Sequence, residues 1–257
     1  MMVKKMNRKT TRNLNNETWS IRKQAKVISP IVISTVHGKG LRVMLASIAE
    51  YCPEVPVYLR GPQSVIGGFD TDLKVFGSPH NFGEDYNQII DRALSDGFDS
   101  VVVANDDIVL TPTSYKFLME DVQQLKKETA DPVGWVSARC DAARPGQNIR
   151  TNPFDEKLHY FKYPYEDCIV QMEVVSPIFA WIERDAWECF KFPPLNWYSD
   201  DVHCEDLRQA GFQHYLSRSY VHHIGSATIG LDGERLTQQA MPWLRKNRPH
   251  YAEVWFK

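Results

Sequence analysis

The sequence predicts an α/β fold with a mainly parallel central sheet flanked by helices. Short, β-branched apolar runs such as Ile31–Val36 and Ser100–Ala104 indicate strands that are buried on both faces. Segments with apolar residues at helical spacing, such as Leu41–Tyr51, alternate with these runs, and such alternation is typical of parallel sheets. The 257 residues, 43% of them apolar, suffice for one large domain or two small ones.

The individual elements follow from the same patterns. The expected strands or extended segments are Ile31–Val36, Val55–Leu59, Leu73–Phe76, Ser100–Ala104, Val133–Ala138, Val174–Glu183 and Tyr215–His223. The expected helices are Leu41–Tyr51, Asp85–Ser95, Ser114–Glu128, Asp185–Phe190 and Asp200–Ala210. Ser199 is the expected N-cap of the last helix, and Gly211 its end. The stretch Arg139–Tyr165 is rich in Pro, Asn, Gly and charge, which predicts a long surface loop.

Charge is distributed unevenly along the chain. The net charge is −2, but residues 1–26 hold eight Lys and Arg against one acid, Glu17, which leaves −9 for the rest. This segment lacks a hydrophobic period, so we expect a flexible basic arm. Either it is a solubilising tail, or it meets phosphates on an anionic partner.

Composition excludes several classes of protein. No run is long and apolar enough for a membrane helix, and no apolar stretch follows the basic N-terminus as in a secretory signal. Five scattered cysteines without a CxxC pair favour a reduced, cytoplasmic protein. GxxxxGK[ST], GxGxxG and GxSxG are all absent, which argues against P-loop ATPases, Rossmann dehydrogenases and α/β-hydrolases.

Two acidic clusters and a histidine pair are the candidate metal-binding and catalytic residues. Asn105-Asp106-Asp107 directly follows a buried strand, so these acids lie at its carboxyl end, where a divalent cation could bind; a solvated turn is the other interpretation. Asp200 and Asp201 begin a helix, where they either complement its dipole or supply a general base. His222 and His223 could contribute one metal ligand.

Taken in order, these segments resemble the inverting family 2 glycosyltransferases of the GT-A fold, from about Pro30 to Thr228. Asn105-Asp106-Asp107 is similar to the DXD position of that family. Tyr198-Ser199-Asp200-Asp201 resembles its Glu-Asp motif, and His223-Ile224-Gly225-Ser226-Ala227-Thr228 its late His-x-Gly-Ser-x-Thr motif. Asn81-Phe82-Gly83 with Asn87, and Val175–Ala186 on the acceptor side, resemble further family segments.

The resemblance implies a nucleotide-diphospho-sugar donor, with a UDP-sugar favoured, and Mn²⁺ or Mg²⁺ as cofactor. Asp107 and His223 would hold the metal, with His222 less well placed. Asp201 would be the general base, with Asp200 second. The donor would contact Ser34, Thr35, Arg60, Gly83, Asn87 and Asp106, and the acceptor side would include Trp181 and Trp197.

The chain departs from the family pattern at three points: Asn105 replaces the first acid of DXD, Asp200 replaces a Glu, and Arg60-Gly61 stands where an acid often reads the base.

The expected acceptor is a glycan or a hydroxymethylated DNA base, the latter as in small viral enzymes of this type. A nucleotidyltransferase and a non-catalytic nucleic-acid-binding module remain the alternatives. The expected division is a basic arm (1–26), a GT-A domain (27–235) and a C-terminal helical extension (236–257).

Overall fold

The computed structural model describes residues 28–141, 143–144, 146–149, 167–223 and 233–256. The predicted basic arm, most of the predicted 139–165 loop and residues 224–228 of the late histidine motif lie outside these ranges.

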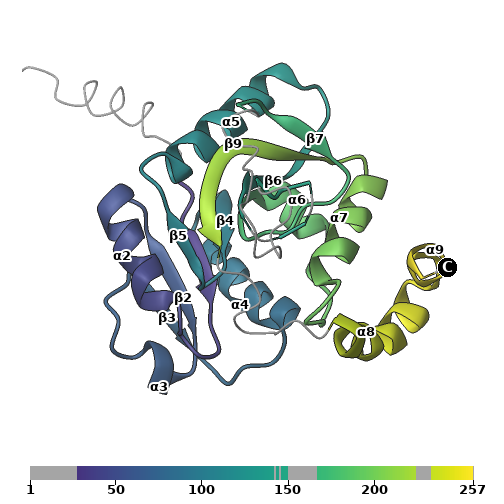
Figure 1. Cartoon of the computed structure of the whole chain (residues 1–257), viewed down its shortest axis with the longest axis horizontal. Coiled ribbons are helices and arrows are strands. Elements are labelled where there is room, and N and C mark those ends of the chain that lie inside the picture. Colours follow the sequence, from purple (N-terminus) through teal and green to yellow (C-terminus); the bar gives the residue numbers. More distant parts are fainter. Residues whose placement is uncertain (1–27, 142, 145, 150–166, 224–232, 257) are drawn as a thin grey trace, which may run out of the picture.

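One mixed sheet with the strand order β3-β2-β1-β4-β8-β6-β9-β5 forms the centre of the molecule, and β7 pairs with β9 (Figure 1). The strands are β1 (Ile31–Ser34), β2 (Val57–Gly61), β3 (Leu73–Phe76), β4 (Ser100–Ala104), β5 (Ile108–Leu110), β6 (Val133–Arg139), β7 (Val170–Met172), β8 (Phe179–Glu183) and β9 (Gln213–His223). Strands β1 to β4 pair in parallel, as predicted.

The second half of the sheet differs from the mainly parallel expectation. Strand β8 lies between β4 and β6 and runs antiparallel to both, while β6 and β9 are parallel. Four of the pairings among the described strands are parallel and four antiparallel. A fully buried strand shows the same apolar run in either direction, so its pattern does not encode its orientation.

Helices cover both faces of the sheet. They are α2 (Leu41–Tyr51), α3 (Gln63–Ile66), α4 (Phe82–Ser95), α5 (Ser114–Glu128), α6 (Arg184–Cys189), α7 (Ser199–Gln209), α8 (Gly233–Asn247) and α9 (Pro249–Trp255). Apolar residues of α2 and α5 build the core on one face, and those of α4, α6 and α7 the core on the other. None of the helices in the described ranges has both the length and the hydrophobicity to cross a bilayer.

Helices α8 and α9 pack beside α7 at one end of the molecule (Figure 1). Arg248 forms a bidentate pair with Asp206 of α7, at 2.9 Å from Nε and 2.7 Å from the second guanidinium nitrogen. The Tyr251 hydroxyl donates to the same carboxylate over 2.7 Å. Charge-assisted, bidentate bonds of this kind are among the strongest in proteins, so α9 is firmly attached to α7.

Two helix starts differ from the prediction. Helix α4 begins at Phe82, three residues early, because Asn81 caps it by accepting a bond from the Glu84 amide over 2.9 Å. Ser199 does not cap α7, since its hydroxyl donates to the Pro193 carbonyl over 3.0 Å. The residue that precedes α7 is Tyr198, in the left-handed conformation.

Candidate functional site

The turn that follows β4 lies against the loop that follows β1. The Thr35 hydroxyl donates to the Asp106 carboxylate and accepts a bond from the Gly38 amide over 2.9 Å. Gly40 packs directly on the same turn, where a Cβ would lie only 2.5 Å from the Asp106 carbonyl oxygen. Burial raises the pKa of Asp106, and the Thr35 bond opposes this rise. Asp106 therefore holds the two loops together, next to Asp107.

Asp107 and His223 meet because β5 pairs with β9, with Ile108 opposite His223. His223 Nε2 lies 3.2 Å from Asp107 Oδ1 and 3.4 Å from the Asn105 amide nitrogen. Both side chains are 8% exposed. His222 points elsewhere and pairs with Asp141. Of the two predicted histidines, the structure brings only His223 to Asp107.

A hard divalent cation fits this pair, because a carboxylate oxygen and a neutral imidazole nitrogen are both ligands for Mn²⁺. Within the described ranges no group of three or more His, Cys, Asp or Glu is arranged to hold a metal. Two protein ligands suit a cation that takes its remaining ligands from water and phosphate oxygens, as Mg²⁺ commonly does.

Two of the predicted donor contacts have structural partners instead. The Asn87 amide donates to the Phe192 carbonyl over 2.9 Å and accepts from its amide over 3.1 Å. A Cβ on Gly83 would lie 1.8 Å from the Pro193 carbonyl oxygen. Both residues therefore dock α4 against the segment that leads into α7.

Arg60, at the end of β2, is fully buried. It pairs with Asp85 over 2.8 Å and donates to Gln88 over 3.0 Å and to the Ser78 carbonyl over 2.9 Å. One terminal guanidinium nitrogen of Arg60, NH1, is buried and has no hydrogen-bond partner among the described residues. Ser34 ends β1, partly exposed, and pairs with Arg60 in the sheet register. The ends of β1 and β2 thus place a hydroxyl and a spare guanidinium donor on adjacent strands.

Asp200 and Asp201 share a single guanidinium at the start of α7. Arg144 lies 3.0 Å from Asp200 and 2.9 Å from Asp201, and the Ser176 hydroxyl donates to Asp200 over 3.1 Å. Burial and the neighbouring Asp200 raise the pKa of Asp201 to about 6, although Arg144 opposes the rise. Burial alone would lower the pKa of Arg144, but the two carboxylates raise it above its usual range. Asp201 is therefore more basic than an ordinary carboxylate and still ionised at neutral pH.

Hydrogen bonds connect the Asp107–His223 pair to the Asp200–Asp201 pair through Asn105. The side-chain amide of Asn105 lies beside His223, and its backbone amide donates to the Ile178 carbonyl over 2.9 Å. The Ile178 amide donates to the Ser176 carbonyl, and the Ser176 hydroxyl donates to Asp200. The two halves of the predicted site therefore belong to one bonded assembly.

The two tryptophans predicted for the acceptor side differ in their exposure. Trp181 is 2% exposed, in the middle of β8 and within the core, so it does not reach a surface where an acceptor could bind. Trp197 is 38% exposed and meets Tyr198 edge-on at 6.3 Å.

Sequence reasoning missed Arg144 and the aromatic residues Tyr251 and Trp255 of α9. Arg144 was hidden in the expected 139–165 loop, where no local pattern marks it. Tyr251 and Trp255 are four residues apart and so share a helix face. That spacing was the one available signal.

At the sequence level, no protein-family model and no curated protein matches the chain. Its structure is similar to the crystal structure of GalNAc-T7 with UDP, GalNAc and Mn²⁺, with a TM-score of 0.53 and 13% identity over 78% of this chain and 44% of that one. It is also similar to S. aureus TarS 1-349, with a TM-score of 0.53 and 10% identity over 90% of this chain and 75% of that one. A197 from STIV matches with a TM-score of 0.47 and 11% identity, over 74% of this chain and 81% of that one. The chain has the GT-A fold.

Proposed function

We propose that this GT-A chain is a metal-dependent glycosyltransferase that moves a sugar from a nucleotide-diphospho-sugar to an acceptor hydroxyl with inversion. The observation that carries the proposal is the bonded assembly that joins Asp107 and His223, through Asn105, Ser176 and Asp200, to a carboxylate of raised pKa, Asp201. A nucleotidyltransferase, the alternative left by the sequence, would have no use for such a base.

Asp107 and His223 would hold Mn²⁺ or Mg²⁺, which when bound would offset negative charge on the diphosphate. The described GalNAc-T7 structure contains UDP and Mn²⁺, which supports a UDP-sugar and a divalent cation here. Asp106 positions the turn that carries Asp107, through its bond to Thr35. Ser34, partly exposed at the end of β1, is the candidate for contact with the nucleoside, and the buried Arg60 beside it would position the end of β2 through its pair with Asp85.

Asp201 takes the proton of the acceptor hydroxyl as its oxygen attacks C1 of the sugar. The new C1–O bond forms as the bond from C1 to the phosphate oxygen breaks, and that electron pair leaves with the nucleoside diphosphate. Attack opposite the leaving group inverts the anomeric centre. Arg144 orients the Asp201 carboxylate, and Asp200 raises its basicity.

The test is a screen of nucleotide-diphospho-sugars with Mn²⁺ that measures release of nucleoside diphosphate. Wild-type protein should hydrolyse one donor, and Asp107→Asn should remove both this activity and the effect of Mn²⁺ on donor affinity. The matched control is Asp70→Asn, an exposed aspartate between α3 and β3 that takes part in none of the bonds of the assembly. Full hydrolysis by the wild type in excess EDTA would contradict the metal assignment, and no binding of any donor would contradict the function as a whole.

A further inference from the structure

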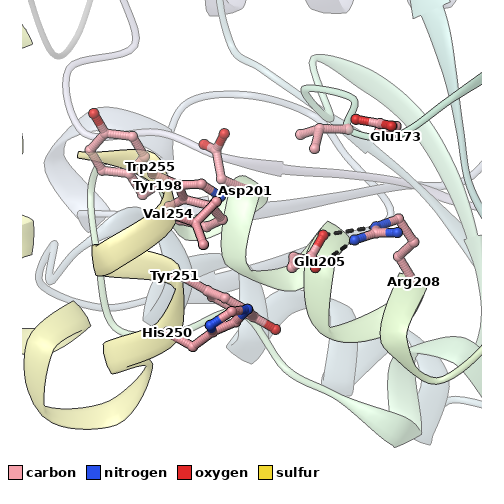
Figure 2. Close-up of a pocket in the computed structure, with 10 residues that line it drawn as sticks. Glu173, Tyr198, Asp201, Glu205, Arg208, His250, Tyr251, Val254 and Trp255 are labelled. Carbon is pink, nitrogen blue, oxygen red and sulfur yellow. Dashed lines mark hydrogen bonds and ion pairs between the residues drawn. The ribbon is translucent and has the colours of Figure 1, made fainter. Parts of the chain in front are cut away.

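A cavity of about 500 Å³ opens beside Asp201, between α7, α9 and the segment before β8 (Figure 2). Sites for small molecules commonly measure about 300–1,000 Å³. Asp201 is one of the residues that line it, so a ligand in this cavity would lie next to the proposed base.

One wall of the cavity is aromatic. The rings of Tyr198 and Trp255 are 6.1 Å apart and inclined by 25°, and those of Tyr251 and Trp255 are 5.1 Å apart and inclined by 24°. Val254, 51% exposed, extends this apolar surface. The bond network of Asp206 with Arg248 and Tyr251 fixes the wall against α7.

Tyr198 supports this wall at a cost in backbone strain. Its φ of 65° makes it the one non-glycine residue of the described chain with a positive φ. For a bulky side chain this conformation costs roughly 1–2 kcal/mol. Such strain persists where the surroundings impose it and clusters at ligand sites.

The rest of the cavity lining is polar and acidic. Glu173, Asp201 and Glu205 belong to it, and Figure 2 shows the Glu205–Arg208 pair across from Tyr198 and Trp255. Arg208 is held by Glu205 at 2.7 and 2.8 Å. Arg144, which adjoins Asp201, is likewise engaged by carboxylates. Apart from His250, each cationic side chain described in or beside the cavity is thus already paired with a carboxylate. The net charge around the cavity is therefore negative.

We propose that this cavity is the acceptor site and that it binds a neutral carbohydrate. The apolar C–H face of a sugar ring would lie on the aromatic wall, and its hydroxyls would donate to Glu173 and Asp201. Phosphate groups of a nucleic acid would meet carboxylates and no unpaired arginine, whereas nucleic-acid binding depends on cations that neutralise phosphates. This inference rests on the proposed function, and of the two acceptor classes expected from the sequence it selects the glycan.

The test uses the full chain with UDP and Mn²⁺. Saturation-transfer NMR measures binding of neutral disaccharides (lactose, maltose and chitobiose) and competition by a single-stranded DNA dodecamer and by heparin. At least one disaccharide should bind at millimolar concentration, and neither polyanion should displace it.

Variants at Trp255 locate the binding. Trp255→Ala should raise the acceptor KM, or the Kd of the bound disaccharide, about tenfold, and Trp255→Phe should recover most of the affinity. Tyr51→Ala, which removes an exposed aromatic residue of α2 outside the cavity, is the matched control. Melting temperatures of all three variants separate a loss of binding from a loss of fold.

Binding of none of the sugars, competition by the DNA or by heparin, or an unchanged acceptor KM in Trp255→Ala would overturn the carbohydrate assignment. Donor hydrolysis distinguishes this failure from that of the proposed function. If a donor is hydrolysed but no neutral sugar binds, the cavity assignment alone fails; if no nucleotide sugar is bound or hydrolysed, the proposed function fails as well.

Discussion

Arg144 and Asp200 act on the same carboxylate in opposite directions, which allows a sharp test of Asp201 as the base. Arg144→Gln removes a cation that lowers the pKa of Asp201, and Asp200→Asn removes an anion that raises it. In a pH profile of kcat/KM for transfer, the acidic limb reports the pKa of the base in the free enzyme. We therefore expect the acidic limb, which lies near pH 6 in the wild type, to move to higher pH in Arg144→Gln and to lower pH in Asp200→Asn.

The size of the upward movement follows from the geometry. Arg144 lies 2.9 Å from Asp201. Two unit charges about 4 Å apart interact by about 4 kcal/mol at an effective dielectric constant of 20, which corresponds to a change of about three in the pKa of the carboxyl. The two side chains are 28% and 20% exposed, and Arg144 is divided between two carboxylates, so solvent and sharing reduce the effect. We expect a displacement of about one to two pH units.

The other charged groups around Asp201 supply the control. Glu173, Glu205, Arg208 and His250 line the same cavity. Arg208→Gln removes a cation that is held by Glu205 and does not contact Asp201, so the limb should stay in place. Single-turnover transfer at each pH, with the melting temperature measured beside it, separates titration from unfolding. Displacement of the limb in the same direction by Arg144→Gln and Asp200→Asn, or in neither, would refute Asp201 as the titrating base.

Three further outcomes are expected. Asp201→Asn should slow transfer about 10²–10⁴-fold and keep the donor affinity. The raised pKa of Asp201 also means that the folded wild type loses stability as pH rises from about 4 to about 6. Calorimetry should therefore show that this variant melts at a higher temperature than the wild type at pH 8 but not at pH 4. Gly83→Ala should cost about 1–3 kcal/mol in the free energy of unfolding, since its Cβ would meet the Pro193 carbonyl, whereas Gly68→Ala, with open space around it, should cost little in the same urea titration. Asp206→Asn should weaken the attachment of α9 by about 1.5–3 kcal/mol and expose the C-terminal helices to limited proteolysis, while an unchanged cleavage rate would contradict the role given to this bond network.

The strands could be predicted because their side chains are buried on both faces. Ile31, Val102 and Val103 are fully buried, so solvent gives no reason for polar residues in their runs. Strand direction could not be predicted, because β8 shows the same kind of run and yet lies antiparallel between β4 and β6. Strands β5 and β7 are only three residues long each, and they depend on their pairing with β9.

The candidate site was predictable where a motif follows a strand. The position of Asp107 after β4 was predictable, and the pairing of β5 with β9 brings His223 to it. Arg144 and Trp255 could not be found in this way, since their value comes from contacts with residues about 57 positions away: Arg144 with Asp201, and Trp255 with Tyr198. Asn87 has a structural role that its motif position did not indicate, because its amide bonds the backbone of Phe192, and its contact with the donor stays a prediction.

The local rules fail together at the start of α7. The hydroxyl of Ser199 is used elsewhere instead of capping the helix, Tyr198 adopts a left-handed backbone, and Asp201 carries a charge that its burial disfavours. Each feature opposes stability, and natural sequences keep such inconsistencies chiefly at functional or strained sites. Here they converge on the start of α7, where Tyr198 and Asp201 both line one cavity, next to the assembly that holds Asp107 and His223. Their coincidence is a stronger reason to place the chemistry here than any single motif. A glycine or asparagine at position 198 would adopt the left-handed conformation with less strain, and we would expect one of them if this helix start served only the fold.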